Sequence, residues 1–186
     1  LLCAEMTLAF CEGMQTRRKA GKRGPTPGIR HMLAYGEPEG GINSMPAHCG
    51  DNELYNVHLR PFEVGFKNGA SNVMTSYNLV NGIPCTISPL INNLIRGKWH
   101  WEGTVISDAC AVSNLIWQGF AEDDGDAAAV SLKAGNDFCC WEGYRFSKGL
   151  KLALERGQLT EADLDVPVRR VLLSKFKSGI FEHPYI

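Results

Sequence analysis

Short β-branched runs recur along the chain between stretches whose apolar residues repeat with a helical period. The run at 104–106 is Thr-Val-Ile, which is typical of a short buried strand. By the same patterns we expect strands over 29–35, 72–77, 104–107 and 136–140, and helices over 1–15, 52–68, 89–96, 108–118, 127–134, 146–156 and from Thr160 onward. Alternating strands and helices predict an α/β fold with a parallel sheet and crossover helices.

Several element boundaries are marked by residues with special backbone or capping behaviour. Thr160, with Asp163 three residues later, predicts a capping box at the start of the last helix. The residues 16–28 are rich in Gly, Pro and Lys and predict a loop, and the acidic residues 122–126 predict another. The Asn-Gly-Ile-Pro sequence at 81–84 predicts a turn after the second strand.

Asp108 is the first candidate for chemistry, because it follows directly on the strand 104–107. In barrels of alternating strands and helices, catalytic side chains gather at the carboxyl ends of the strands. Ser107 and Asp108 are also favoured helix N-caps, and this segment alone favours capping of the following helix. The other strand ends alter that balance, since they carry further polar residues that we expect at the same edge: Arg30, His31, Tyr77, Asn78 and Asp137.

Composition limits the classes of function. The chain has 186 residues, fewer than the roughly 250 of a complete eight-stranded barrel, and a net charge of −1. Its apolar runs are too short for a membrane span, and the basic cluster at 17–23 lacks interleaved aromatic residues, so we expect neither a membrane nor a nucleic-acid partner. The first residues lack a signal-peptide pattern, and we expect the native N-terminus to lie upstream of Leu1.

The cysteines and histidines do not form a metal-binding pattern. Seven cysteines make an odd set without CxxC or Cys/His spacing, and the five histidines are scattered. We therefore expect free, mostly buried thiols, no metal site and no cofactor.

A carboxylate among a phenol, an imidazole and a guanidinium suits attack on an electrophilic sugar carbon. In retaining glycosidases one carboxylate forms a covalent glycosyl intermediate, while a second carboxyl group about 5 to 5.5 Å away protonates the leaving group. Tyr77 would hold Asp108, and Arg30 and His31 would bind sugar hydroxyls. Each residue alone also has a structural interpretation: Tyr77 as an amphipathic plug, His31 as a satisfied core residue, and Arg30 as a surface ion-pair partner.

Several motifs agree in order and spacing with one family. They are Arg-His-Met-Leu-Ala-Tyr-Gly-Glu-Pro-Glu-Gly-Gly at 30–41, Val-Met-Thr-Ser-Tyr-Asn at 73–78 with the turn at 81–84, Leu-Ile-Arg-Gly-Lys-Trp at 94–99 before Val-Ile-Ser-Asp at 105–108, and the closing segments 169–172 and 179–185. Together they resemble the barrel domain of glycoside hydrolase family 3, the β-glucosidase and β-xylosidase group.

The resemblance implies a fold and an organisation. The fold would be part of a TIM-type (β/α)8 barrel, incomplete at the N-terminus, in which residues 1–179 form the partial catalytic barrel and residues 180–186 begin a linker to a second domain. That second domain would supply the general acid, usually a Glu. We therefore expect the isolated chain to be almost inactive and poorly stable, because an open barrel exposes sheet edges.

The resemblance also implies an activity and a set of residues. The protein would be a retaining β-glycosidase that removes terminal β-D-glucosyl residues from small or oligomeric glycosides. Asp108 would be the nucleophile, Tyr77 its neighbour, and Arg30 and His31 ligands of sugar hydroxyls. Some residues depart from the family pattern: Arg30 replaces the usual Lys, and Ala109 stands where many β-glucosidases have Trp. Ile42-Asn43 also replaces the usual Arg-Asp, and His100 the usual Gly.

Three alternatives stay open at this point. The first is a β-xylosidase of the same family. The second is a doubly wound phosphoacceptor module using Asp108, although the acidic pair and the late Lys that such a module needs are not visible. The third is a non-catalytic binding or packing domain, against which the presence of Asp108 and Tyr77 speaks.

Overall fold

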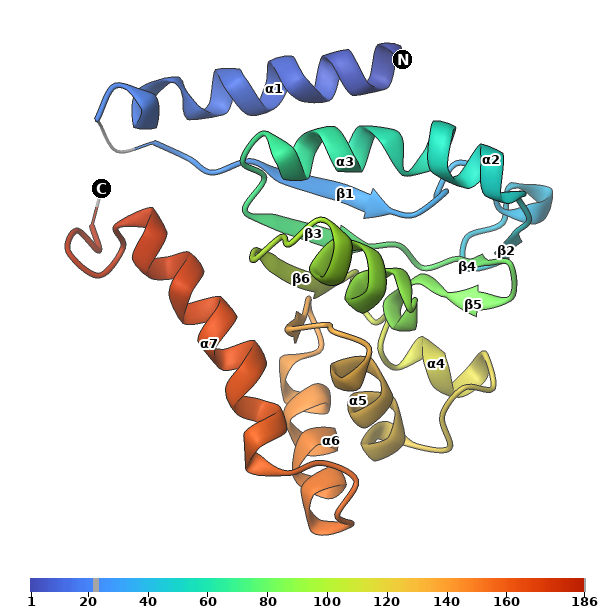
Figure 1. Ribbon diagram of the computed structural model, residues 1–186. Helices are drawn as coiled ribbons and strands as arrows, with labels where there is room; N and C mark the ends of the chain where they lie inside the picture. Colours follow the sequence, from blue (N-terminus) through green and yellow to red (C-terminus); the bar gives the residue numbers. More distant parts are fainter. Residues whose placement is uncertain (22–23, 186) are drawn as a thin grey trace.

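The computed structural model describes residues 1–21 and 24–185, and its centre is a parallel sheet (Figure 1). The sheet contains, in spatial order, β1 (Gly28–Met32), β3 (Asn72–Thr75), β6 (Thr104–Ser107) and β7 (Phe138–Cys139). Val73 lies opposite Ile29 on one side and opposite Val105 on the other. All pairs are parallel, so the carboxyl ends of these strands share one edge, as the predicted α/β class requires.

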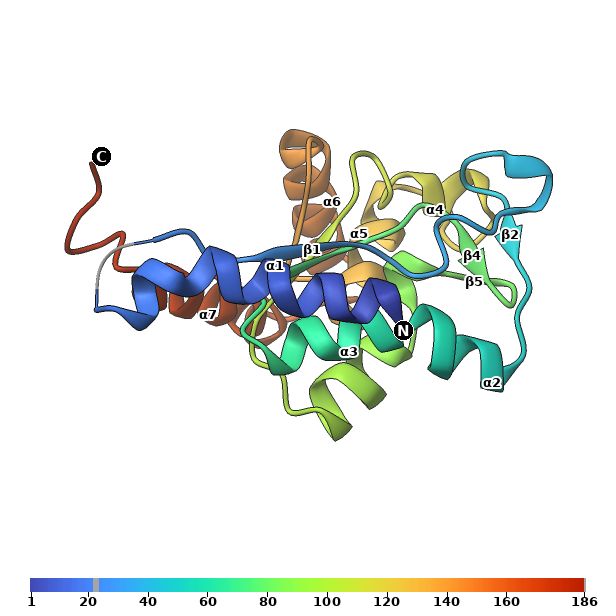
Figure 2. The ribbon, with the colours of Figure 1, turned by 90° about the horizontal axis from the view of Figure 1, so that it is seen from above.

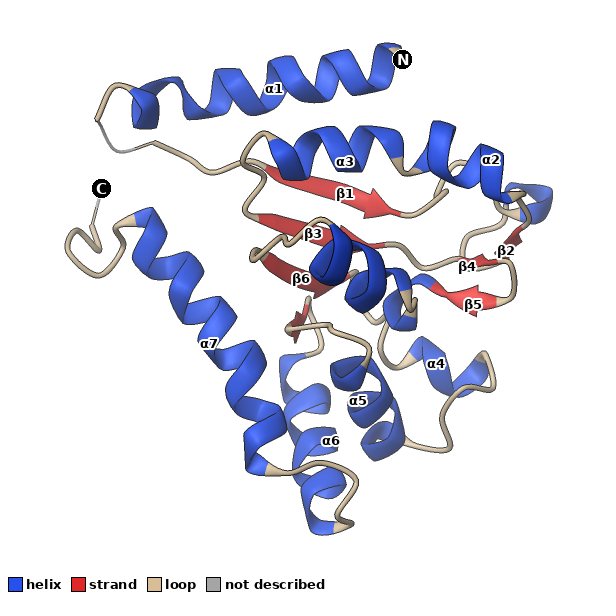
Figure 3. Cartoon of the chain, in the orientation of Figure 1, coloured by secondary structure: helices blue, strands red, loops and turns tan. Residues whose placement is uncertain are grey.

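Helices connect the strands and cover the sheet (Figures 1 and 3). The α-helices are α1 (Leu2–Lys19), α2 (Asp51–Glu53), α3 (Arg60–Lys67), α4 (Asn114–Trp117), α5 (Asp124–Lys133), α6 (Gly143–Glu155) and α7 (Glu161–Ser178). Two π-helices, η2 (Leu54–His58) and η4 (Ile91–Lys98), and two short 3-10 turns, η1 (Glu39–Gly41) and η3 (Cys85–Ile87), complete the set in the described residues. In Figure 2 the strands run between α3 on one side and α6 on the other.

Two strand residues form the centre of the core. Val73 and Val105 are fully buried, and Leu59, Ile91 and Ile95 from the helices pack into the same cluster. Burying each of these side chains contributes roughly 1.5 to 3 kcal/mol. A second cluster, which includes Ala129 and Ala153, joins α5 to α6. Beside it, Gly149 of α6 lies so close to the backbone of Asp124 that a Cβ at this position would collide with the Asp124 carbonyl oxygen.

A second, smaller sheet shapes the loop that follows β1. Strand β2 (Pro46–Ala47) pairs with β4 (Leu79–Val80), and β4 pairs with β5 (Ile83–Pro84) through the predicted turn. Asn81 and Gly82 at that turn have φ of 51° and 83°, as a type I′ hairpin needs. The Asn81 side chain also exchanges hydrogen bonds with the backbone of Cys49, at 3.0 and 2.8 Å, and so ties the loop to the hairpin.

The capping box at the start of α7 is confirmed. Thr160 accepts a hydrogen bond from the backbone N–H of Asp163, whose carboxylate accepts one from the N–H of Thr160. The helix ends at Gly179, which adopts the left-handed conformation with φ of 75°. The end of the barrel domain at 179 and the linker at 180–186 both stay predictions.

Several expected boundaries were wrong, and three of them differ most from the structure. Helix α1 continues to Lys19 rather than ending at residue 15, so the basic residues 17–19 lie in its last turn, where cations favour the helix dipole. Helix α5 begins at Asp124 within the expected acidic loop, because the Asp123 side chain accepts from two backbone N–H groups of the first turn. The expected helix over 108–118 is mostly a turn, and only α4 is helical.

The cysteines are free thiols in the described part of the chain. Cys11 and Cys85 are buried, whereas Cys3 and Cys110 are exposed, so the expectation of mostly buried thiols holds for only two of the seven. No helix among the described residues is both long and apolar enough to cross a membrane.

Candidate active site

Three of the predicted residues meet at the carboxyl edge of the main sheet. Asp108 follows β6 directly, Tyr77 follows β3, and His31 lies near the end of β1. The His31 Nε2 atom lies 3.4 Å from Oδ2 of Asp108, and the Tyr77 hydroxyl hydrogen-bonds to the same carboxylate. Neighbouring parallel strands therefore bring a carboxylate, an imidazole and a phenol into direct contact.

The Asp108 side chain is largely enclosed by its neighbours. Its side chain is 12% exposed, and its Oδ1 atom accepts a hydrogen bond of 2.7 Å from the backbone N–H of Ala109. Helix α4 begins only at Asn114, and its N-cap residue is Ser113. Asp108 therefore does not cap the following helix, and the capping interpretation of this segment was wrong.

A buried polar clamp holds the segments that carry Tyr77 and His31. The Ser76 hydroxyl accepts from the backbone N–H of Leu33 at 2.8 Å and donates to the carbonyl of Leu33 at 3.1 Å. Asn78, which is fully buried, donates to the same carbonyl at 3.1 Å. Because buried polar groups need partners, this clamp fixes the chain after β1 against the chain after β3.

Tyr77 is placed to act as a hydrogen-bond donor. Burial, together with its hydrogen bond to Asp108, raises the pKa of Tyr77 well above the ordinary value for tyrosine. The phenol therefore stays protonated at neutral pH, and its O–H points a hydrogen bond at the carboxylate.

His31 favours its neutral form. Burial lowers the pKa of His31 below 6.5 and nearby Arg30 lowers it further, while the charge of Asp108 opposes both. The neutral imidazole has one donor and one acceptor nitrogen, which suits contact with a hydroxyl group.

The lowered pKa of His31 predicts a loss of stability in acid. Above the unfolded-state pKa, near 6.5, His31 is neutral in both the folded and the unfolded protein, so its titration does not change stability. As the pH falls through 6.5, His31 of the unfolded chain binds a proton more readily than His31 of the folded chain, and this favours unfolding. We expect the free energy of unfolding, measured with urea, to fall less between about pH 7.5 and about pH 5.5 in His31→Gln than in the wild type. Equal losses would contradict this account.

Tyr35 belongs to the cluster although its role was not predicted. Its ring centroid lies 4.8 Å from that of His31 and 6.3 Å from that of Tyr77. The signal available in the sequence was its position four residues after His31, in the same Gly-rich stretch.

Arg30 is solvent-exposed. Among the described residues, Asp108 forms its ion-pair contact with His31 and not with the guanidinium of Arg30. It lies with His31, Tyr35 and Glu37 on the wall of a hollow of ≈ 450 Å³ at the carboxyl end of β1. Its proposed contact with a sugar is therefore separate from the Asp108 carboxylate.

Asp137 does not belong to this site, which corrects the expectation that it shares the edge with Asp108. It precedes β7, and its Oδ2 atom accepts from the N–H of Val105, near the start of β6, at 2.7 Å. Its side chain is 0% exposed and pairs with Arg96 at 2.7 Å and Arg170 at 3.0 Å. Asp137 is thus a structural anchor between the sheet and α7.

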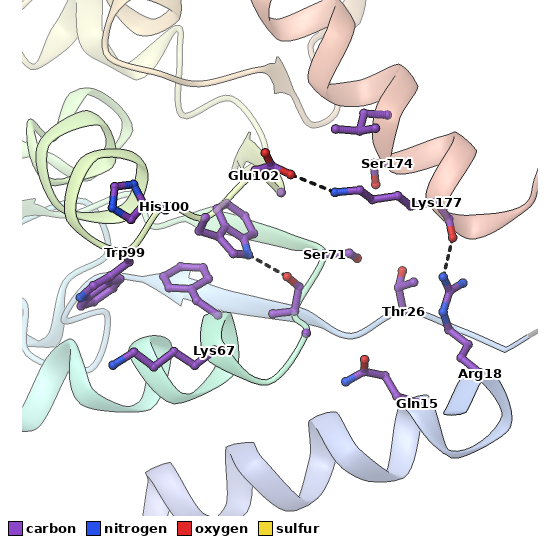
Figure 4. Close-up of a pocket in the computed structure, with 16 residues that line it drawn as sticks. Gln15, Arg18, Thr26, Lys67, Ser71, Trp99, His100, Glu102, Ser174 and Lys177 are labelled. Atoms are coloured by element: carbon purple, nitrogen blue, oxygen red, sulfur yellow. Dashed lines mark hydrogen bonds and ion pairs between the residues drawn. The ribbon is translucent and has the colours of Figure 1, made fainter. Parts of the chain in front are cut away.

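A second cavity opens at the opposite end of the strands (Figure 4). It has a volume of ≈ 390 Å³ and is lined by Ser71 and Gly103, which precede β3 and β6. The Trp101 indole N–H donates to the carbonyl of Ala70 at 2.8 Å, and Lys177 pairs with Glu102 at 3.1 Å. Lys67 pairs with Glu63, and Arg18 donates to the carbonyl of Lys177. Because the charged groups that line this cavity already have protein partners, and because it lies away from the carboxyl edge, we assign it a structural role.

The fold and the cluster together define a class of protein. A parallel α/β domain that gathers a carboxylate, a phenol and an imidazole at the carboxyl ends of its strands has the arrangement that is typical of barrel-type enzymes. In the described residues, no group of three His, Cys, Asp or Glu side chains could hold a metal ion.

Comparison with known proteins identifies the family. Residues 2–173 match the family described as Glycosyl hydrolase family 3 N terminal domain. A periplasmic beta-glucosidase of Salmonella typhimurium is 34% identical over 185 residues, which cover 99% of this chain and 24% of that protein. Probable beta-D-xylosidase 7 of Arabidopsis thaliana is 36% identical over 133 residues, covering 69% of this chain and 17% of that protein.

A solved structure gives the same answer for the fold. A beta-glucosidase from Listeria innocua in complex with gluconolactone superposes with a TM-score of 0.90 at 32% identity, covering 98% of this chain and 26% of that chain. The chain therefore belongs to glycosyl hydrolase family 3, and its predicted fold as part of a TIM-type barrel is confirmed. Although nearly all of this chain aligns with these two β-glucosidases, it spans only about a quarter of their length.

Proposed function

We propose that this protein is a retaining β-glycosidase that hydrolyses terminal, non-reducing β-D-glucosyl residues, with Asp108 as its nucleophile. The observation that carries the proposal is the position of the Asp108 carboxylate directly after β6, in contact with both His31 and Tyr77. Membership of glycosyl hydrolase family 3 supports it, because a relative aligned with 99% of the chain is named a beta-glucosidase.

The reaction has two displacements at the anomeric carbon. First, an oxygen of Asp108 attacks that carbon, the bond to the leaving oxygen breaks, and a general acid donates a proton to the leaving oxygen. Then water attacks the same carbon, the ester bond to Asp108 breaks, and the former acid takes a proton from the water. We assign the acid to a carboxyl group outside these 186 residues, in the second domain that the family resemblance implies.

The neighbours of Asp108 have distinct roles in this proposal. Tyr77 donates its hydrogen bond to the carboxylate and orients it for attack. Neutral His31 binds a sugar hydroxyl, and Arg30 binds another from the wall of the adjoining hollow. Arg presents a planar fork of donors where the family usually has Lys, so it reaches the sugar with a different geometry.

The nucleophile assignment is tested by trapping the intermediate. The intact protein is incubated with a 2-deoxy-2-fluoro-β-glucosyl inactivator, and the labelled peptide is identified by mass spectrometry. We expect one glucosyl adduct at Asp108 and none in Asp108→Asn. An adduct on another carboxylate would overturn the assignment.

The sugar preference is tested with the matching 2-fluoro xylosyl inactivator. Relatives named beta-glucosidase and beta-xylosidase both align with the chain, so β-xylosidase is the second candidate. We expect faster inactivation by the glucosyl reagent, and faster inactivation by the xylosyl reagent would select the second candidate.

A further inference from the structure

Trp141 is an exposed aromatic residue on the same edge of the sheet as Asp108. Trp141 is 87% exposed, which is more than most other aromatic residues of the chain. In the register of β6 and β7, Ser107 lies opposite Cys139. Asp108 and Cys140 follow one residue later, so the segment with Trp141 leaves the sheet beside the segment with Ala109.

The backbone at Trp141 turns in an uncommon way. Its φ is 72°, in the left-handed region that bulky residues rarely adopt. Cys110, on the neighbouring segment after Asp108, also has a positive φ, of 60°. Uncommon conformations of this kind gather at ligand sites, where the surrounding structure holds them.

The next residue anchors Trp141 to the segment that carries Asp108. The Glu142 side chain is only 7% exposed and accepts a hydrogen bond of 3.3 Å from the backbone N–H of Ser113. It also accepts a hydrogen bond from the thiol of Cys110. An exposed indole is therefore held on a fixed backbone next to the 108–113 turn, rather than on a free loop.

We propose that Trp141 is the stacking platform for the second sugar ring of an oligosaccharide, the ring that leaves when the bond at Asp108 is cleaved. An indole offers a broad apolar face of low conformational entropy, which suits the C–H face of a pyranose ring. Ala109, the residue after the nucleophile, has no side chain that could itself offer a stacking face. This inference rests on the proposed function, because it places the platform relative to the bond that Asp108 attacks.

The experiment compares two substrates with the same glucosyl group. Laminaribiose has a leaving sugar ring, whereas β-glucosyl fluoride has none. In the intact protein we expect Trp141→Leu to lower kcat/KM for laminaribiose about tenfold and to leave kcat/KM for the fluoride unchanged, while Trp141→Phe retains most of the laminaribiose activity. Tyr144→Ala, at a residue of similar exposure on α6, is the matched control and should change neither value.

The outcomes separate the platform from the proposed function. Equal losses on both substrates, or a Tyr144→Ala effect as large as that of Trp141→Leu, would overturn the platform. If the wild type hydrolyses neither substrate, the proposed function fails. The platform is then tested by calorimetry of laminaribiose binding to the wild type and to Trp141→Leu. Weaker binding in the variant supports the platform, and equal or absent binding overturns it.

Discussion

Replacing Asp108 with alanine is expected to lower kcat on an aryl β-glucoside by roughly a thousandfold or more, because the variant loses the atom that attacks the anomeric carbon. The shape of the site should survive, since the clamp formed by Ser76 and Asn78 does not involve Asp108. The measurement is kcat in the intact protein, with circular dichroism to establish folding.

Adding azide to Asp108→Ala tests whether the lost group is the nucleophile. Azide should enter the space left by the carboxylate and attack the anomeric carbon, so that a carbon–nitrogen bond forms and the bond to the aryl oxygen breaks. The product should be the α-glucosyl azide, because a single displacement inverts the configuration. Asp165→Ala, at an exposed carboxylate on α7, is the control and should keep wild-type kcat. Full activity in Asp108→Ala, or a β-azide product, would refute the assignment.

Replacing Asp137 with asparagine is expected to cost roughly 3 to 5 kcal/mol in the free energy of unfolding. The substitution preserves shape but leaves the Arg96 guanidinium, whose side chain is only 11% exposed, without its buried carboxylate partner. It also weakens the contact with Arg170, through which α7 is held to the sheet. Urea unfolding monitored by fluorescence measures the loss.

A surface ion pair provides the control for Asp137. Glu63 pairs with Arg60 and Lys67 on the exposed face of α3, and Glu63→Gln should cost no more than about 1 kcal/mol. Similar losses in Asp137→Asn and Glu63→Gln would show that the buried network does not anchor α7.

The strands were predictable because their signal is local. Thr104, Val105 and Ile106 favour an extended chain through their branched side chains, and the structure has β6 at the expected residues. The capping box of Thr160 and Asp163 was equally local, since it needs only residues within one helical turn.

The end of α1 and the course of the chain after Asp108 could not be predicted, because contacts between residues distant in sequence determine them. Gln15 donates to the carbonyl of Asn68, and Arg18 to that of Lys177, so residues distant in sequence support the last turns of α1. After Asp108, the backbone N–H of Ser113 is taken by Glu142 from the next strand–helix connection, and the chain turns before α4 begins. Neither partner is visible in a sequence window.

The sequence by itself determined the alternation of strands and helices, the family, and three of the residues that meet at the candidate site, because these depend on local side-chain preferences and motif spacing. Tertiary structure alone decided which polar residues share an edge. It brings Tyr35 to His31 and Tyr77, and it places Asp137 at the start of β7 with two arginines. The physical reason is register: where a short strand begins, and which residue it faces, depends on hydrogen bonds with its neighbours.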